Sequence, residues 1–449
     1  MAIWNKIRRK LNDNNTDQYE VVMTADRYGN IYDPADTTSK NRVKISDSET
    51  LFFNTFQYGI ETDIWDTGIT GTASADHDLD LSHVDLSVGG TLGDKIVRQT
   101  RHVQRYVPGR SSTLSFAINM NAPVEGVRKR FGLFTESTVD NLLDGCWFED
   151  SGAWIDNVPQ YACVVSNGAA GYISIPRSEW NGDKLDGTGI SGILADPEKL
   201  QLITIDYEWY GAGQVKFGWV IDGRTRVVHT HSTANISVEP WASTPFLPIR
   251  LEMEVIATPT VPGPFTMIQG SNSLIAENSQ GHTGTSQNIT SSILGTTNSG
   301  ANEWNPVLSI RLNPNDLGAV VLPKFLQAVT LDNTNLFYRL VRNPTLPPTV
   351  AINADGPQPW KSVDPVNGFA EYQTYINPDE VLEADQGTSV ESGFVIGGGG
   401  GGSIPLDPAV AYQLGRTQLG TVSDTLTVLC AMTNVAKDSV VSMTWIEQR

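Results

Sequence analysis

An alternation of apolar and polar residues between positions 202 and 210 constrains the fold of this chain more than any other feature. The stretch reads LITIDYEWY, so apolar side chains recur at every second position. Because successive side chains of a β-strand point to opposite faces, the pattern predicts a strand with one buried and one solvent-facing side. Asp206 and Glu208 are expected on the solvent-facing side.

Further strands of the same kind follow. Residues 215–221 repeat the alternation, and Asp222-Gly223 separates them from a return strand at 225–231. Asp-Gly between two apolar runs predicts a type I′ hairpin turn, because both central residues must have positive φ. A further alternating segment spans 249–255. Antiparallel strands with one apolar face need a second sheet to cover it, so the pattern predicts a β-sandwich.

The carboxy-terminal third contains short apolar segments separated by Pro, Gly, Asn and Asp. These segments are 307–312, 319–322, 336–341, 350–353, 370–375, 425–432 and 440–446. Regular short strands with such punctuation predict a second antiparallel sandwich. We therefore expect a mainly β chain with two antiparallel β-sandwich domains.

The predicted domain organisation has four parts. Between the sandwiches lies a stretch rich in Ser, Thr, Asn and Gly, whose composition buries little surface and predicts a linker. The expected parts are an N-terminal anchoring and assembly region, a first sandwich, the linker and a C-terminal sandwich, at residues 1–94, 95–275, 276–303 and 304–449. A run of six glycines at 397–402 is interpreted as a mobile loop tip, with a closely approached backbone as the alternative.

The first twelve residues follow a different pattern. Ile3, Ile7 and Leu11 recur at every fourth position beside Trp4, while basic residues occupy the positions between them. This spacing predicts a short N-terminal amphipathic helix of about three turns. We expect the stripe formed by Trp4, Ile7 and Leu11 to dock on a sister chain or another protein of an assembly; a frayed tail is the alternative.

The charge of the chain is unevenly distributed. The formal net charge is −19, yet residues 95–130 carry +7 and residues 1–12 carry +4, which leaves −30 for the remainder. Segregated charge orients association between complementary surfaces. The basic segment is thus expected to bind either the acidic surface of another copy of the chain or acidic residues of its own chain. The basic residues assigned to a candidate assembly interface are Arg98, Arg101, Arg105, Arg128 and Arg130.

Composition excludes several classes of protein. The acidic balance argues against a nucleic-acid-binding protein, which needs clustered Lys and Arg. Three cysteines form neither a disulfide framework nor a zinc motif, and no stretch approaches the ~20 apolar residues of a membrane span. The segment Gly187–Gly192 matches G-x-G-x-x-G but lacks a following helical pattern, so we expect a loop and no bound cofactor.

The remaining candidates for chemistry are weak. Asp206 and Glu208 are spaced like a carboxylate pair, although no third carboxylate stands in step with them. The segment 76–80 alternates aspartates without the rest of a calcium loop, and His229 with His231 lacks a third ligand. No catalytic, cofactor-binding or metal-binding residue is therefore expected, and we expect a protein that is not an enzyme.

Several motifs resemble a widespread group of tailed-bacteriophage virion proteins. They are RQTR (98–101), RYVPGR (105–110), VRKRFGLF (127–134), WNGDKLDGTG (180–189) and GAGQVKFG (211–218), with a weaker echo in SMTW (442–445). The group is described loosely as structural, tail, fibre or baseplate proteins. The resemblance implies a virion component with a lectin-like (jelly-roll) sandwich, and it offers no catalytic residues to carry over.

The expected function is therefore that of a structural virion protein in a tail fibre, or in the baseplate or tail tip. The expected partners are copies of the chain, as a trimer or hexamer, and other virion proteins, with no nucleic acid and no membrane. Assembly in the host cytoplasm is expected before release in the virion. The alternatives are a lectin-like receptor-binding module, with Trp209 or Trp241 stacking on sugar rings of a host-surface glycan, and a head-decoration protein.

Overall fold

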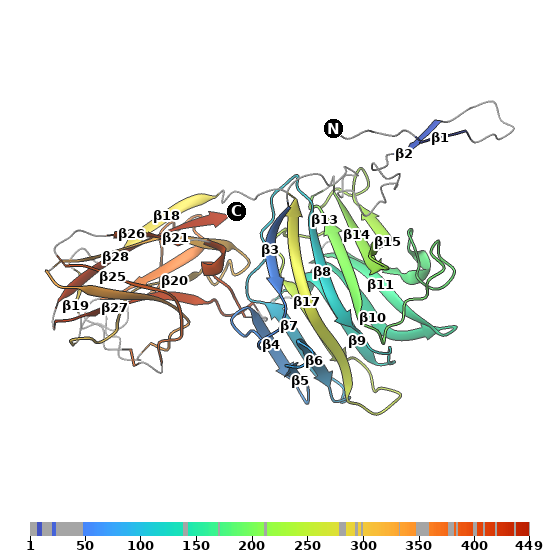
Figure 1. The fold of residues 1–449 in the computed structure, drawn as a ribbon, viewed down its shortest axis with the longest axis horizontal. Coiled ribbons are helices and arrows are strands. Elements are labelled where there is room, and N and C mark those ends of the chain that lie inside the picture. The colour runs from blue at the N-terminus through green and yellow to red at the C-terminus, as the bar shows by residue number, and fades with distance from the viewer. Residues whose placement is uncertain are drawn as a thin grey trace.

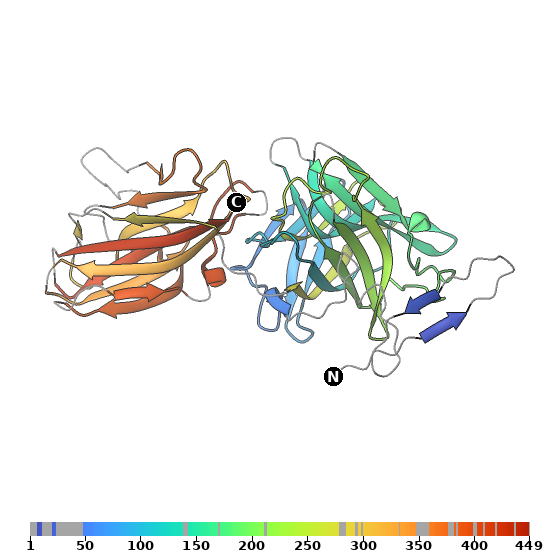
Figure 2. The same cartoon turned by 90° about the horizontal axis from the view of Figure 1, so that it is seen from above.

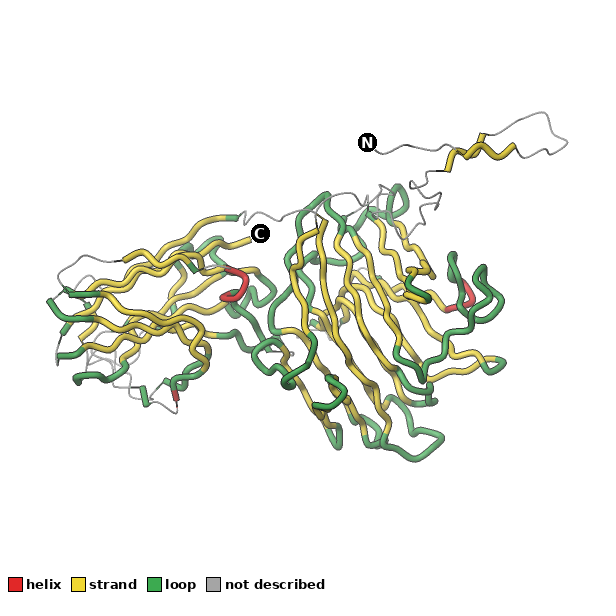
Figure 3. Tube along the Cα trace, viewed as in Figure 1, coloured by secondary structure: helices red, strands yellow, loops and turns green. Residues whose placement is uncertain are grey.

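Two pairs of antiparallel sheets make up the protein in a computed structural model of the full chain. The structure describes residues 7–10, 20–23, 48–137, 142–168, 171–210, 213–277, 284–291, 295–297, 300–331, 333–346, 359–375, 381–382, 385–397, 402–406, 409–417, 420–434 and 437–448. The two sandwiches lie side by side along the longest axis of the molecule (Figures 1 and 2). The described residues are mainly strands and loops, as the sequence predicts (Figure 3).

The first sandwich contains a seven-stranded and an eight-stranded sheet. In order across the seven-stranded sheet, the strands are β12 (Tyr172–Pro176), β11 (Val158–Asn167), β10 (Leu143–Ile155), β9 (Val127–Glu136), β16 (Ile249–Val255), β7 (Lys95–Thr100) and β4 (Trp65–Thr70). The eight-stranded sheet runs β15 (Arg224–Ser232), β14 (Gln214–Ile221), β13 (Gln201–Tyr207), β8 (Ser112–Asn119), β17 (Phe265–Glu277), β6 (His83–Val88) and β5 (Ser74–Asp78), with β3 (Ser48–Asn54) also pairing with β17.

The predicted hairpin is confirmed at β14 and β15. Asp222 and Gly223 have φ values of 52° and 71°, as a type I′ turn requires. Strand β16 has the predicted bounds, but it lies in the opposite sheet, between β9 and β7. The alternating segments thus belong to both layers of the sandwich.

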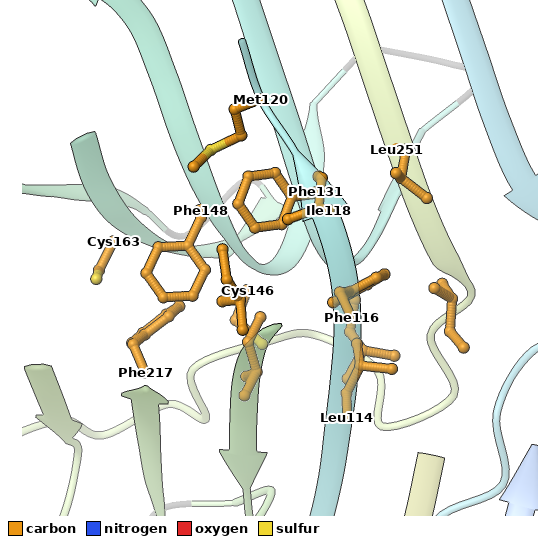
Figure 4. Close-up of a cluster of buried hydrophobic side chains, with 14 of the residues drawn as sticks. Leu114, Phe116, Ile118, Met120, Phe131, Cys146, Phe148, Cys163, Phe217 and Leu251 are labelled. Carbon is orange, nitrogen blue, oxygen red and sulfur yellow. The ribbon is translucent and has the colours of Figure 1, made fainter. Parts of the chain in front are cut away.

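The two sheets enclose one large apolar core (Figure 4). At its centre Phe148 stacks on Phe131 at a ring distance of 5.5 Å and meets Phe217 edge-on at 5.1 Å. Phe131 and Phe148 are opposite residues on β9 and β10, whereas Phe217 comes from the other sheet. Truncating a fully buried Phe such as Phe148 to Ala typically costs ~3–5 kcal/mol, so this contact stabilises the packing of the two sheets.

The first sandwich begins earlier than predicted. Strands β3 to β6 lie within residues 1–94, which the sequence analysis assigned to a separate N-terminal region. The predicted boundary is wrong because the strand pattern in this region is short. In β6, for example, only Val84, Leu86 and Val88 alternate as buried residues.

A second sandwich contains a five-stranded and a six-stranded sheet. The five-stranded sheet runs β18 (Thr285–Thr290), β28 (Asp438–Gln448), β21 (Val320–Thr330) and β26 (Gly402–Pro405), with β19 (Thr296–Thr297) also pairing with β28. The six-stranded sheet runs β23 (Lys361–Ser362), β24 (Ala370–Thr374), β20 (Asn305–Leu312), β27 (Thr425–Met432), β22 (Leu336–Arg342) and β25 (Thr388–Val395). Six of the seven predicted segments fall on these strands, and 350–353 lies outside the described residues.

The predicted linker is also corrected in part. Strand β18 lies within 276–303 and pairs with β28 from Thr285↔Glu447 to Thr290↔Ser442. Threonine is favoured in strands, so a polar Ser/Thr-rich segment can form an edge strand as well as a loop. The middle of the six-glycine run lies outside the described residues.

At the N-terminus the described residues are strands rather than a helix. Ile7–Lys10 form β1, which pairs with β2 (Glu20–Met23) in antiparallel register. The helix prediction is therefore wrong at Ile7, and Trp4 and Leu11 lie outside the described residues. A three-turn helix is marginal in water on its own, while the valines of β2 favour a strand partner. Among the described residues, no helix is long and apolar enough to cross a membrane.

Candidate functional site

The basic residues assigned to a candidate interface are distributed over the framework of the first sandwich. Arg98 points into the core, where its guanidinium lies 5.3 Å from the rings of both Phe56 and Trp65 and its Nε donates to Gln269 (2.7 Å). Burial lowers the pKa of Arg98 to about 10, although the charge of Glu61 acts in the opposite direction. Arg98 is fully buried and therefore serves the core rather than an exposed interface.

Arg128 and Arg130 lie on the outer face of the seven-stranded sheet, which is the face turned away from the core. Arg128 contacts Glu254 at 2.6 Å, and Arg130 contacts Glu149 at 2.7 Å and Glu252 at 3.3 Å. Arg105 is buried, 3.9 Å from Glu49. These contacts correspond to the intramolecular alternative for the basic segment, and they give no support to the assembly interface, which stays a prediction.

A charged layer covers the centre of that outer face. We use this name for six side chains, Lys95, Arg130, Glu136, Glu149, Arg250 and Glu252. Arg250 donates to Glu252 (2.6 Å) and to Glu136 (2.7 Å), and its guanidinium lies 5.4 Å from the ring of Phe134. Burial alone raises the pKa of Glu252, but the surrounding cations outweigh burial and lower this pKa to about 2. The charged side chains of this layer therefore form ion pairs with one another.

A second set of ionic contacts joins the two sandwiches. Arg101, just after β7, contacts Asp66 of its own sandwich (3.0 Å) and Asp424 of the second sandwich, where the carboxylate is fully buried. Asn343 also donates to Asp424 (2.8 Å). Burial raises the pKa of Asp424, but hydrogen bonds and charge from Arg101 outweigh it and lower the pKa below its ordinary value. We call this set of contacts the joint.

Apolar and backbone contacts extend the joint. Val103 packs against Val320 and Leu322 of the second sandwich. Gln413 donates to the carbonyl of Val103 (2.9 Å). Arg416 donates from its backbone N–H to Arg101 O (2.8 Å) and from its Nη2 to Thr135 Oγ1 (3.0 Å). The second sandwich is thus bonded to the first through several side chains.

The candidate carboxylate pair does not lie on a solvent-facing surface. Asp206 and Glu208 are 6% and 2% exposed, which corrects the expectation for this strand. Strand β13 lies between β8 and β14, and Asp206 accepts hydrogen bonds from Ser111 (2.5 Å) and Thr113 (3.2 Å). A polar face at the middle of a broad sheet is buried by its neighbours, which a local alternation cannot reveal.

The tryptophans proposed as a sugar-stacking ledge are also not free. Trp241 is 3% exposed and donates from Nε1 to the carbonyl of Glu208 (2.9 Å). Trp209 is half-buried and donates to the carbonyl of Ala242 (2.8 Å). Neither ring forms an exposed ledge, so this expectation is corrected.

The glycine motif at 187–192 is a loop, as predicted. An isolated bridge pairs Asp186 with Leu194, and the Asp183 carboxylate accepts the N–H groups of Leu185 (3.1 Å) and Ser191 (2.9 Å). A Cβ on Gly189 would lie 2.2 Å from Asp183 Oδ1, so glycine is needed there for packing of the loop.

The histidine pair on β15 has a structural environment. Asn181 N–H donates to His229 Nδ1 (3.4 Å), and burial, with the charge of His231, lowers the pKa of His229 to about 4. In the described parts of the chain, no three His, Cys, Asp or Glu side chains are grouped to hold a metal ion.

Two adjoining cavities lie where strands β9, β10 and β11 meet the 231–244 segment. The larger, of about 620 Å³, is lined by Thr135, Ser137, Leu142, Asp144, Asn167, Gly168, Glu239, Pro240, Ser243 and Thr244. The smaller, of about 150 Å³, is lined by Val165, Asn167, Gly171, Ile173, His231, Ser232, Thr233, Ile236, Ser237, Glu239, Pro240 and Trp241. No motif in the sequence pointed to this groove, because its residues come from separate turns.

Comparisons with known proteins identify no family for the chain. No protein-family model matches the sequence, and no curated protein does. Among solved structures, the legume lectin-like domain from Entamoeba histolytica is similar, with 11% identity, 46% of this chain and 89% of that chain covered, and a TM-score of 0.29. A Bacillus licheniformis β-glucanase has 12% identity, 51% and 98% coverage, and a TM-score of 0.32. The CBM2 module of the evolved Dit of Lactobacillus casei BL23 phage J-1 has 12% identity, 53% and 99% coverage, and a TM-score of 0.33.

Proposed function

We propose that this chain is a non-catalytic structural protein of a tailed-phage virion, located in a tail fibre or in the baseplate or tail tip. The observation that carries the proposal is the position of the resemblance motifs. Arg98 lies in the core, Arg101 lies in the joint and Arg130 lies in the charged layer. These three motif residues thus serve the packing of the fold rather than an open reactive centre, which suits a protein whose role is assembly.

The environments of two acidic residues, Glu252 and Asp206, support the non-catalytic part of the proposal. A glycosidase needs one carboxylic acid that stays protonated at its working pH, beside a second carboxylate. The cations around Glu252 act in the opposite direction and lower its pKa to about 2. The carboxylate of Asp206 is buried and accepts hydrogen bonds from two hydroxyl groups, which hold it away from solvent.

The proposed partners are copies of the same chain, as a trimer or hexamer, and other virion proteins. Cyclic symmetry lets one pair of complementary surfaces close a ring. The joint supports this role, because two sandwiches held by a buried ion pair and apolar packing present their outer surfaces in a fixed arrangement.

Immunogold labelling of purified phage particles with an antibody against the chain tests the proposal. The expected result is gold at the tail, at the fibre or the baseplate, with an unlabelled control from particles that lack the gene. Gold on the head instead would support a decoration protein and contradict the tail assignment. A chain absent from washed particles would refute the structural role altogether.

A second candidate is a receptor-binding module for a host-surface glycan. It is favoured by the groove formed by the two cavities, whose larger part has the volume of an ordinary ligand pocket, roughly 300–1,000 Å³. Pull-down of the chain on host cells, with and without enzymatic removal of surface glycans, separates this role from assembly alone.

A further inference from the structure

The two cavities beside β10 and β11 adjoin one another, and together they are called the groove. They share Asn167, Glu239 and Pro240, which form the wall between them. Asn167 ends strand β11 and donates from Nδ2 to the carbonyl of Pro240 (2.6 Å), so the wall is fixed by a side-chain hydrogen bond. The groove therefore has a wide compartment and a narrow one in a set arrangement.

The wide compartment is polar and its side chains are held in place. Of the ten described residues that line it, seven carry a hydroxyl, amide or carboxylate group. Asp144 accepts the backbone N–H of Ser243 (2.8 Å) and its hydroxyl (2.5 Å), and Thr135 Oγ1 accepts a hydrogen bond from Arg416 (3.0 Å). A site with side chains oriented in advance loses little conformational entropy when a ligand binds.

The shared wall offers unused hydrogen-bond acceptors. Among the described residues, the side-chain oxygen of Asn167 and the carboxylate of Glu239 accept no hydrogen bond. Glu239 is exposed, so its carboxylate is available to a ligand. Acceptors beside hydroxyl groups match the hydroxyls of a sugar, each of which both donates and accepts.

The narrow compartment supplies apolar surface. Val165, Ile173, Ile236 and Trp241 line it, and Ile173 and Ile236 are 48% and 80% exposed. Sugar rings present C–H groups on their faces, and ligand sites commonly combine an apolar surface with a few fixed polar groups. An exposed isoleucine beside free acceptors fits such a ring better than it fits a fully polar ion.

The charge of the lining selects against anions. Among the described residues, no Lys or Arg lines either compartment, and the exposed carboxylate of Glu239 lies on the wall that both compartments share. Burial lowers the pKa of His231, so this side chain adds no positive charge at neutral pH. Carboxylated, sulfated and phosphorylated ligands are disfavoured by like-charge repulsion.

We propose that this groove binds a neutral oligosaccharide, with Glu239 and Asn167 accepting hydroxyl hydrogen bonds and Ile173 and Ile236 contacting the face of a ring. The inference deepens the receptor-binding candidate and rests on it. It assigns the ring contact to Ile173 and Ile236 instead of stacking on an exposed tryptophan, and it specifies the charge of the ligand.

Isothermal titration of the purified full chain tests the proposal. The probes are neutral hexasaccharides of glucose, galactose and mannose, with a hexamer of galacturonic acid as the charged comparison. We expect saturable binding of at least one neutral probe and none of the hexuronate. In the Glu239→Gln variant we expect binding about 10-fold weaker, because a neutral amide oxygen replaces a charged acceptor.

Two variants make the result specific. Glu198→Gln removes another exposed carboxylate, which lines neither cavity, and it should leave binding unchanged. Thr244→Trp fills the wide compartment and should abolish binding while the circular dichroism spectrum stays that of the folded chain. Equal binding by all variants, stronger binding of the hexuronate, or no neutral probe binding at up to about 10 mM would overturn the proposal.

These outcomes are independent of particle location. A chain that binds neutral saccharide in solution yet is absent from virions contradicts the structural role and leaves the groove supported. A chain found on the tail that binds no saccharide contradicts the groove alone.

Discussion

Two glutamates of strand β16 allow the contribution of the charged layer to be measured. Glu252 and Glu254 lie two residues apart on the same face, and each contacts an arginine of β9. The side chain of Glu252 is 1% exposed, whereas that of Glu254 is 23% exposed. Glu252→Gln and Glu254→Gln therefore remove the same charge from one strand in two different environments.

We expect Glu252→Gln to lower the free energy of unfolding at pH 7 by about 3 kcal/mol. The pKa of Glu252 is lowered from its ordinary 4.5 to about 2, and each pKa unit corresponds to ~1.4 kcal/mol. Breaking a buried ion pair from one side costs a similar ~3–5 kcal/mol. For Glu254→Gln we expect less than about 1 kcal/mol, because partly exposed pairs are screened by solvent.

The pH dependence follows from the same pKa. A carboxylate whose pKa is lower in the folded than in the unfolded state stabilises the fold fully above the unfolded value. Its contribution is lost as the pH falls through the folded value. The difference between the wild type and the E252Q variant should therefore shrink between pH 4.5 and about 2, where the wild-type carboxylate becomes protonated.

Hydrogen exchange of the amides of β9 and β16, measured from pH 7 down to pH 3, reports this local stability without requiring both sandwiches to unfold together. Urea unfolding at pH 7 gives the total. Equal destabilisation by both substitutions would refute the reasoning from burial. A wild-type-to-E252Q difference that stays constant down to pH 3 would refute the assigned direction of the pKa.

Three further predictions concern the joint, the thiols and catalysis. Asp424→Asn should loosen the two sandwiches, because Arg101 loses its buried partner; small-angle scattering should show a larger radius of gyration, and an unchanged profile would contradict the role of this pair. Burial raises the pKa of the buried thiols of Cys146, Cys163 and Cys430, that of Cys430 to about 12. Iodoacetamide should therefore label no cysteine in the native chain and all three in urea. Rapid labelling of the native chain would contradict this prediction. Neutral glycans incubated with the chain should keep their length by mass spectrometry, and any shortening that an inactive control preparation lacks would contradict a non-catalytic protein.

The sequence was sufficient for the local part of the fold. The Asp222-Gly223 turn and the strands around it follow from side-chain alternation and from the φ values that the turn needs. The burial of polar residues on the outer faces of the sheets could not be predicted from the same alternation. Asp206 looks solvent-facing in its own segment, and only the hydroxyls of Ser111 and Thr113, from a strand and loop about 90 residues away, show otherwise.

The ion-pair partners of the charged residues also could not be predicted from local sequence patterns. Counting charges over 95–130 gives a net +7, but Arg101 pairs with Asp424, 323 positions further along the chain. The groove also depends on distant segments, since Asp144 near the start of β10 pairs with Asn167 at the end of β11, while Ser243 comes from a later loop. Contacts of this range depend on how the sheets are ordered, which alternation does not specify.

The four residues of the RQTR motif show why such a short string is informative about this architecture. Alternation along β7 sends Arg98 into the core and Gln99 to the charged layer, where it accepts a hydrogen bond from Arg250 (3.2 Å). Thr100 accepts the N–H of Ile249 (3.1 Å), and Arg101 reaches across the joint to the second sandwich. The motif therefore contributes to the core, the charged layer and the joint at once. Local alternation along β7 predicts the inward and outward directions, but the partners come from segments far away in the chain.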